Sequence, residues 1–132
     1  MSEIKKTANL YILDDHERLR GILVDYLDTS PGLKVIGQAG LPSVALTELK
    51  TLAPDLILVD MSMPEMSGAD FISSLLSEQP EARCIVLTAH LRSSYAEQAK
   101  EAGAKGFVYK DDPATVLQVI EKVLSGQTFF AT

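Results

Sequence analysis

The 132-residue sequence contains a single cysteine, no long apolar run and no leader-like N-terminus. Cys84 cannot form an internal disulfide, and its place in the apolar run Cys84-Ile85-Val86-Leu87 is typical of a small core residue. No apolar run approaches the ~18 residues that a membrane span needs. The first six residues lack the apolar core of a secretory signal. We therefore expect a cytoplasmic protein without a membrane partner.

Positive charge is scarce as well, with 12 Lys and Arg against 18 Asp and Glu and a formal net charge of −6. Binding to the phosphates of nucleic acid needs a basic face, so the composition argues against this chain binding DNA or RNA by itself. The Cys-x-x-Cys and His-x-x-x-His spacings that are typical of zinc sites do not occur. The length and the hydrophobic fraction of 46% predict a single domain over residues 1–132, with a core from about residue 8 to 126.

Short apolar runs alternate with segments of helical periodicity along this core. The runs predict five strands, at residues 8–14, 33–39, 56–60, 84–88 and 106–110. The helical segments lie at about residues 16–29, 41–52, 68–77, 93–102 and 113–125. Strict alternation of strand and helix predicts an α/β fold, in which a doubly wound parallel sheet of five strands is covered by five helices.

The segment Leu56-Ile57-Leu58-Val59-Asp60 is the centre of this arrangement. Four aliphatic residues in succession indicate a parallel strand that is buried on both faces. Its last residue, Asp60, lies at the carboxyl end of the strand, where open α/β sheets bind their ligands. An Asp in this position is also a common way for a strand to end, so Asp60 alone does not indicate function.

Other polar residues end neighbouring strands. Those at the carboxyl ends are Asp14, Asp15, Asp60, Thr88 and Lys110. In a doubly wound sheet these ends share one edge, so we expect the five side chains to meet there. Two carboxylates ~4 Å apart repel each other by about 1 kcal/mol in water and by about 4 kcal/mol at an effective dielectric constant of 20. Lys110 offsets part of this repulsion, and a divalent cation would offset the remainder. Mg²⁺ fits such a site because it binds few protein oxygens and shares its coordination shell with phosphate.

This set of groups favours phosphoryl transfer. A carboxylate can attack phosphorus and form an aspartyl phosphate, and we expect Asp60 to be that nucleophile. Asp15 is then a direct metal ligand, and Asp14 helps to hold the water shell of the metal. Thr88 and Lys110 supply a hydroxyl and an ammonium to the phosphoryl oxygens.

The same residues carry a resemblance to a known family, the receiver domain of bacterial two-component response regulators. The matching positions are Asp14-Asp15, Asp60 with Met63-Pro64 and Gly68, Thr88-Ala89, and Lys110. The resemblance implies a flavodoxin-like fold with strand order 2-1-3-4-5 and a histidine kinase that phosphorylates Asp60 in the presence of Mg²⁺. It implies that the backbone carbonyl of Ser62 completes the metal shell. It also implies that Thr88 and Phe107 form the conformational switch, and that the domain is a phosphoacceptor rather than an enzyme.

Two further segments, Asp14-Asp15-His16 and 103–111, are similar to the NarL/LuxR-type subgroup of response regulators. Members of this subgroup usually carry a C-terminal helix-turn-helix domain. We therefore expect a receiver that dimerises on phosphorylation and binds DNA only through a domain absent from this chain. Residues 127–132 are expected to begin the linker, although Phe129-Phe130 could instead pack back on the fold.

Three alternatives remain open. The first is a stand-alone receiver that acts by protein–protein contact or as a phosphorelay intermediate. The second is an aspartate-based phosphatase, which usually has a second acid two residues after the nucleophile, where this chain has Ser62. The third is a nucleotide-binding fold that uses the segment 37–40, whose glycine spacing is a weak match.

Three positions depart from the family pattern, at Ser62, Phe107 and Asp111. Ser62 is smaller than the residue that many family members have there, and it leaves room for a water molecule to attack the phosphorylated Asp60. Lys110 is followed by Asp111 where many receivers have a cis proline, so we expect a trans peptide bond there. Phe107 stands at the aromatic switch position and has no hydroxyl. His16 begins a helix and is expected to orient the loop locally rather than to donate phosphate.

Overall fold

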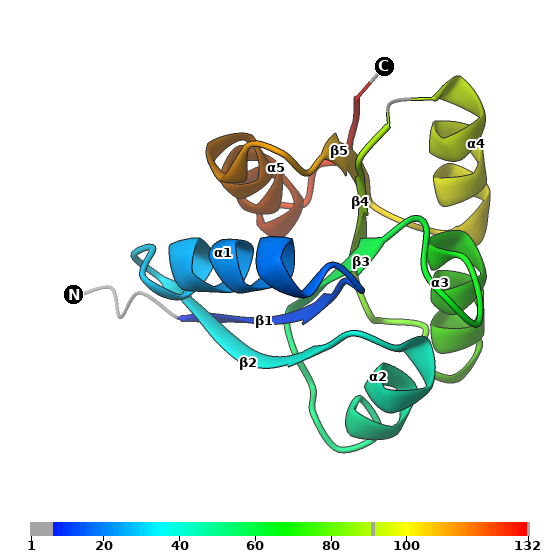
Figure 1. Ribbon diagram of the computed structural model, residues 1–132, viewed down its shortest axis with the longest axis horizontal. Coiled ribbons are helices and arrows are strands. Elements are labelled where there is room, and N and C mark those ends of the chain that lie inside the picture. Colours follow the sequence, from blue (N-terminus) through cyan, green and yellow to red (C-terminus); the bar gives the residue numbers. More distant parts are fainter. Residues whose placement is uncertain (1–6, 91, 132) are drawn as a thin grey trace.

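The computed structural model describes residues 7–90 and 92–131, which form a parallel sheet with helices on both faces (Figure 1). The strand order is β2-β1-β3-β4-β5-β6. The strands are β1 (Ala8–Leu13), β2 (Leu33–Ala39), β3 (Leu56–Asp60), β4 (Cys84–Thr88), β5 (Gly106–Tyr109) and β6 (Phe129–Phe130). The predicted order 2-1-3-4-5 is confirmed for the first five strands.

The helices divide between the two faces of the sheet. They are α1 (Glu17–Asp28), α2 (Pro42–Glu48), α3 (Gly68–Glu78), α4 (Ser93–Ala102) and α5 (Pro113–Leu124). Helices α1 and α5 cover one face, and α2, α3 and α4 cover the other (Figure 1). This is the doubly wound arrangement that the alternating pattern predicts.

Two apolar clusters, one on each face, fill the space between sheet and helices. In β3, Leu56 and Leu58 join the cluster under α1 and α5, whereas Ile57 and Val59 join the cluster under α2, α3 and α4. Every residue of β3 is buried. Burial on both faces explains why the strand is a continuous aliphatic run, and it leaves Asp60 at the one end where a polar group can face a loop.

The C-terminal aromatic residues correct the expected number of strands. Phe129 and Phe130 form β6, which pairs in parallel with Gly106 and Phe107 of β5, so the described part of the sheet has six strands rather than five. Two backbone hydrogen bonds hold this strand in place. The Phe129 N–H donates to the Lys105 carbonyl, and the Ala131 N–H donates to the Phe107 carbonyl. Phe129-Phe130 therefore pack back on the fold. A strand of two residues has no periodicity for sequence analysis to detect.

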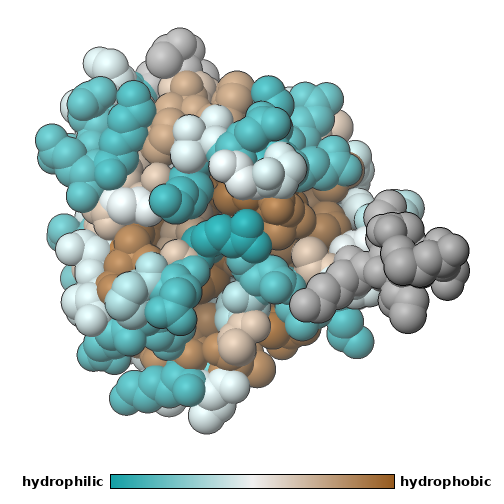
Figure 2. Space-filling view, turned by 180° about the vertical axis from the view of Figure 1, so that it is seen from behind, coloured by the Kyte–Doolittle hydropathy of each residue, from teal (hydrophilic) through white to brown (hydrophobic). Residues whose placement is uncertain are grey.

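The surface is mixed in polarity on the face that Figure 2 shows, where hydrophilic residues interrupt the apolar ones. Among the described helices, none combines the length and the apolar character that crossing a membrane requires.

Candidate functional site

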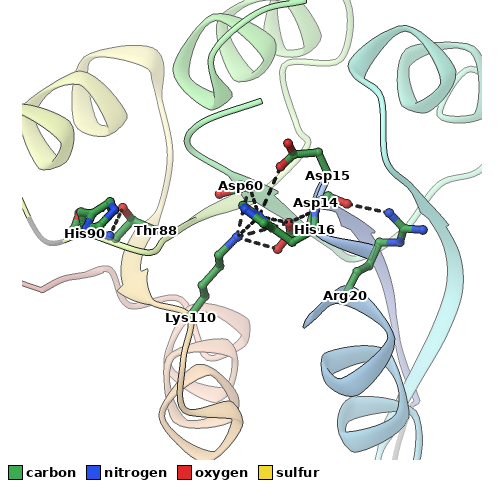
Figure 3. Close-up of polar contacts among 8 residues, drawn as sticks. All are labelled: Asp14, Asp15, His16, Arg20, Asp60, Thr88, His90 and Lys110. Atoms are coloured by element: carbon green, nitrogen blue, oxygen red, sulfur yellow. Dashed lines mark hydrogen bonds and ion pairs between the residues drawn. The ribbon is translucent and has the colours of Figure 1, made fainter. Parts of the chain in front are cut away.

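Three acidic side chains and one ammonium meet at the carboxyl edge of the sheet (Figure 3). Asp14 and Asp15 follow β1, Asp60 ends β3 and Lys110 follows β5. The strand ends are adjacent because Leu13 pairs with Val59 and Asp60 pairs with Leu87. The chain turns away directly after Asp60, where Gly68 donates its backbone N–H to the Met61 carbonyl at 2.8 Å.

Lys110 lies between two buried carboxylates. Its Nζ atom is 3.1 Å from Asp14 Oδ2 and 3.2 Å from Asp60 Oδ2, and the side chains of all three residues are at most 3% exposed. A buried carboxylate is costly unless it is paired, so the ammonium offsets part of the repulsion that the two acids create. One ammonium cannot neutralise two buried carboxylates together with Asp15.

This imbalance appears in the acidity of Asp60. Burial raises the pKa of Asp60, the neighbouring Asp14 carboxylate raises it further, and Lys110 only partly opposes them, which places the pKa at about 7. Two buried oxygens, Asp60 Oδ2 and Asp15 Oδ1, accept no hydrogen bond from the described residues, although the Lys110 ammonium lies 3.2 Å from the first of them as an ion pair. Unsatisfied buried oxygens in an acidic cluster are the donor set that a hard divalent cation binds, so the residues present fit a metal ion.

His16 is a fourth member of the cluster, which sequence analysis did not place there. Its Nδ1 atom lies 3.2 Å from Asp14 Oδ1, 3.4 Å from Asp15 Oδ1 and 3.5 Å from Asp60 Oδ2. One possible ligand atom from His16 and one from each of the three acids all lie within 4.8 Å of one another. The available signal was its position directly after Asp15, at the residue that precedes the first turn of α1.

Arg20 is a second residue that the sequence did not reveal. Its Nη1 donates to the Asp14 backbone carbonyl at 2.7 Å, and its Nε donates to Gln38 Oε1 at 2.9 Å. The guanidinium thus fastens the loop after β1 to the end of β2. An Arg in a predicted helix is usually solvent-exposed, and nothing in the sequence distinguishes Arg20 from such a residue. Its contacts with Asp14 and Gln38 are visible only in the structure.

The structure does not bring the Thr88 hydroxyl into this cluster. Thr88 Oγ1 donates to the His90 carbonyl at 2.7 Å and accepts from the His90 N–H at 3.1 Å, away from Asp60 (Figure 3). Phe107 is fully buried on β5. Ser62 lies exposed in the loop after β3, and the peptide bond between Lys110 and Asp111 is trans, as the sequence predicts.

Comparison with known proteins identifies the same region. Residues 10–121 match the family described as "Response regulator receiver domain". The chain is similar to the DNA-binding transcriptional activator DevR/DosR of Mycobacterium tuberculosis, with 36% identity over 79% of this chain and 48% of that protein. It is similar to the chemotaxis protein CheY of Thermotoga maritima, with 35% identity over 85% of this chain and 93% of that protein.

Comparison with solved structures also finds response regulators. A LuxR-family two-component response regulator from Aurantimonas sp. superimposes with a TM-score of 0.89 and 30% identity, covering 94% of this chain and 89% of that one. The chain spans about half the length of DevR/DosR, the first of the curated relatives that it matches.

Proposed function

This chain belongs to the response regulator receiver domain family, and from that premise we propose that Asp60 accepts a phosphoryl group from a histidine kinase. The observation that carries the proposal is the buried Asp60 carboxylate, which ends a strand, lies 3.2 Å from the Lys110 ammonium and keeps one oxygen without a hydrogen-bond donor among the described residues. That oxygen is Oδ2, the atom nearest the ammonium, and it becomes free to attack phosphorus when Lys110 turns to the phosphoryl group.

The proposed transfer is a displacement at phosphorus. An Asp60 oxygen forms a bond to phosphorus while the bond from phosphorus to the kinase imidazole breaks, and the leaving nitrogen keeps the electron pair. Lys110 leaves its position between the carboxylates to contact the phosphoryl oxygens. Asp14, Asp15, Asp60 and the Ser62 carbonyl would hold Mg²⁺, which supplies positive charge to those oxygens. The domain acts as a phosphoacceptor rather than as an enzyme with an external substrate.

A small-molecule phosphodonor tests this assignment without the kinase. With acetyl phosphate and Mg²⁺, we expect the wild-type protein to gain one phosphoryl group in intact-mass spectra and Asp60→Asn to gain none, because an amide oxygen is not a nucleophile toward phosphorus. Asp111→Asn is the matched control: it alters an exposed acid beside Lys110 and should leave the gain intact. A phosphoryl group that persists in Asp60→Asn would show that the nucleophile is another residue.

The proposed switch begins at Thr88. To donate a hydrogen bond to a phosphoryl group on Asp60, the Thr88 hydroxyl must release the His90 carbonyl. The loop between β4 and α4 then loses one of its anchors, and Phe107 can move toward the space that Thr88 leaves. A surface pocket of about 450 Å³ between the loop after β3 and α4, lined in part by Ser62 and Tyr95, gives α4 room to shift.

Helix α4 is weakly held, and its exchange behaviour should reveal this. It buries only Ala96 and Ala99, whereas α5 buries four branched residues, among them Val116 and Ile120. The apolar side chains that α5 buries stabilise it by over ~1.4 kcal/mol more than those of α4. The amides of α4 should therefore exchange with deuterium at least about tenfold faster than those of α5. Mass spectrometry of the unphosphorylated protein measures this; equal protection of the two helices would contradict the proposed switch.

We infer that the output is control of transcription through a dimer and a DNA-binding domain beyond this chain. The likeness to DevR/DosR, a DNA-binding transcriptional activator, supports this output. Three large apolar side chains, Leu19, Ile22 and Tyr26, are 39–50% exposed on α1, which lies beside α5, and they offer a dimer face. A stand-alone receiver is the second candidate, because the likeness to CheY covers 93% of that protein. The reading frame beyond Thr132 distinguishes the two.

A further inference from the structure

His16 directs a ring nitrogen at the point that the three carboxylates share. In an octahedral shell with metal–ligand distances of about 2.0–2.1 Å, adjacent ligands lie roughly 3 Å apart. The Nδ1 atom of His16 is 3.2–3.5 Å from one oxygen each of Asp14, Asp15 and Asp60. The nitrogen is therefore spaced from three oxygens as ligands of one ion are spaced from each other.

The Nδ1 atom of His16 contacts both a donor and an acceptor of the cluster. The Lys110 ammonium, which has only donors, lies 2.9 Å from His16 Nδ1. The acceptor Asp14 Oδ1 lies 3.2 Å from the same nitrogen. In the tautomer with the ring proton on Nε2, Nδ1 accepts from Lys110 and has the lone pair that a cation needs. A cation in the cluster would take the place of Lys110 at this nitrogen.

Two backbone hydrogen bonds fix the position of the His16 main chain, from which the imidazole extends. The His16 N–H donates to Asp14 Oδ1 at 2.8 Å, and the His16 carbonyl accepts the first hydrogen bond of α1, from Arg20 at 2.8 Å. The side chain is 52% exposed, so a hydrated ion can reach it. The backbone of His16 is fixed by hydrogen bonds at its N–H and its carbonyl, whereas the imidazole ring is accessible to solvent. This combination suits a side chain that turns to bind an incoming ion.

A second observation points to the same place. Asp15 Oδ1 and Asp60 Oδ2 are the two buried side-chain oxygens that lack a hydrogen-bond donor within the described parts of the chain. They are also the oxygens at 3.4 and 3.5 Å from His16 Nδ1. The side chain of Asp60 is only 3% exposed. These two oxygens and the imidazole nitrogen thus lie within reach of one ion.

We propose that His16 ligates the divalent cation of this site through Nδ1, and that the nitrogen shifts the preference of the site from Mg²⁺ toward first-row transition metals. Carboxylate and carbonyl oxygens suit Mg²⁺, whereas an imidazole nitrogen suits ions such as Ni²⁺, Co²⁺ and Zn²⁺. The inference rests on the proposed function, since it concerns the same cluster. It adds a residue and a metal preference that an all-oxygen site does not have.

Calorimetric titration of the tag-free protein with Ni²⁺ and with Mg²⁺ tests the proposal. Loss of outer-sphere partners alone costs about tenfold or more in metal affinity, so His16→Ala should weaken Ni²⁺ binding by at least ~10-fold. Mg²⁺ binding, carried by the oxygens, should change much less. His16→Gln, which offers an oxygen near the same point, should keep Mg²⁺ binding and still lose the Ni²⁺ preference.

The second histidine of the chain provides the matched control. His90 contacts Thr88 through its backbone only, so His90→Ala should bind both ions as the wild type does. With Mn²⁺ as probe, pulsed electron paramagnetic resonance should show a directly bound nitrogen in the wild type and in His90→Ala, and none in His16→Ala.

The outcomes separate this inference from the proposed function. If Ni²⁺ affinity is the same in His16→Ala and the wild type, or Mn²⁺ shows no nitrogen, His16 is not a ligand; phosphorylation of Asp60 by acetyl phosphate would then stand unaffected. If the wild type binds none of the three ions and gains no phosphoryl group, both proposals fail.

Discussion

Asp60→Asn should stabilise the metal-free protein while it abolishes phosphorylation. At pH 8 in the presence of EDTA, we expect the free energy of unfolding to rise by ~1–3 kcal/mol, because the variant removes a buried charge and its repulsion by Asp14. Lys110 keeps its pair of hydrogen bonds to Asp14, so the substitution leaves the ammonium partnered. Urea unfolding followed by circular dichroism measures the difference.

The pH dependence identifies the cause. The pKa of Asp60 is about 7 in the folded protein, against about 3.9 for an unperturbed Asp in the unfolded chain. Between these values the folded state holds a proton that the unfolded state has released, so stability falls as pH rises from about 4 to about 7 and is then constant with respect to this group. The advantage of Asp60→Asn should therefore be largest at pH 8 and small at pH 4.5.

Asp111→Asn serves as the control here too, since this exposed acid should give a difference close to zero at both pH values. A stabilisation of Asp60→Asn that is equal at pH 4.5 and pH 8 would mean that packing, and not the charge of Asp60, is responsible. The expected result has a functional meaning: the domain keeps a destabilising carboxylate at the end of β3 because the same charge is the nucleophile.

The sequence predicts most of the fold because the five longer strands and the five helices each leave a local signal. Buried parallel strands read as aliphatic runs such as Leu56–Asp60, and helices read as 3.6-residue periods. The strand order came from the resemblance, because periodicity does not say which strands are neighbours. The end of α2 at Glu48, four residues before the predicted end near Leu52, and the strand β6 lie where the local signal is weak.

The candidate site was predictable as a set of residues and not as an arrangement of side chains. Asp14, Asp60 and Lys110 meet because topology alone brings their strand ends to one edge. The direction of the Thr88 hydroxyl toward His90 depends on loop conformation, which the sequence does not encode locally. His16 in the cluster likewise follows from how the first turn of α1 meets the end of β1.

A glycine pair should give the other large effect. Gly68→Ala is expected to destabilise the protein by ~3 kcal/mol, whereas Gly21→Ala should stabilise it by ~0.5–1 kcal/mol. A Cβ atom on Gly68 would lie 2.4 Å from the Asp60 backbone oxygen and 3.0 Å from Met61 Cα. A Cβ on Gly21, inside α1, would meet no heavy atom within 4 Å. Urea unfolding of both variants at one pH measures the contrast.

The difference between the two glycines arises from what surrounds them rather than from unusual backbone angles, since neither has a positive φ. The atoms that crowd Gly68 belong to the backbone of Asp60 and Met61 and cannot rotate aside, so the end of β3 that carries Asp60 must move. Gly68→Ala should therefore also slow the gain of a phosphoryl group from acetyl phosphate, and Gly21→Ala should not. Equal stability of the two variants would show that the start of α3 can shift without disturbing Asp60, and the close packing of Gly68 against Asp60 would then have no role in positioning the nucleophile.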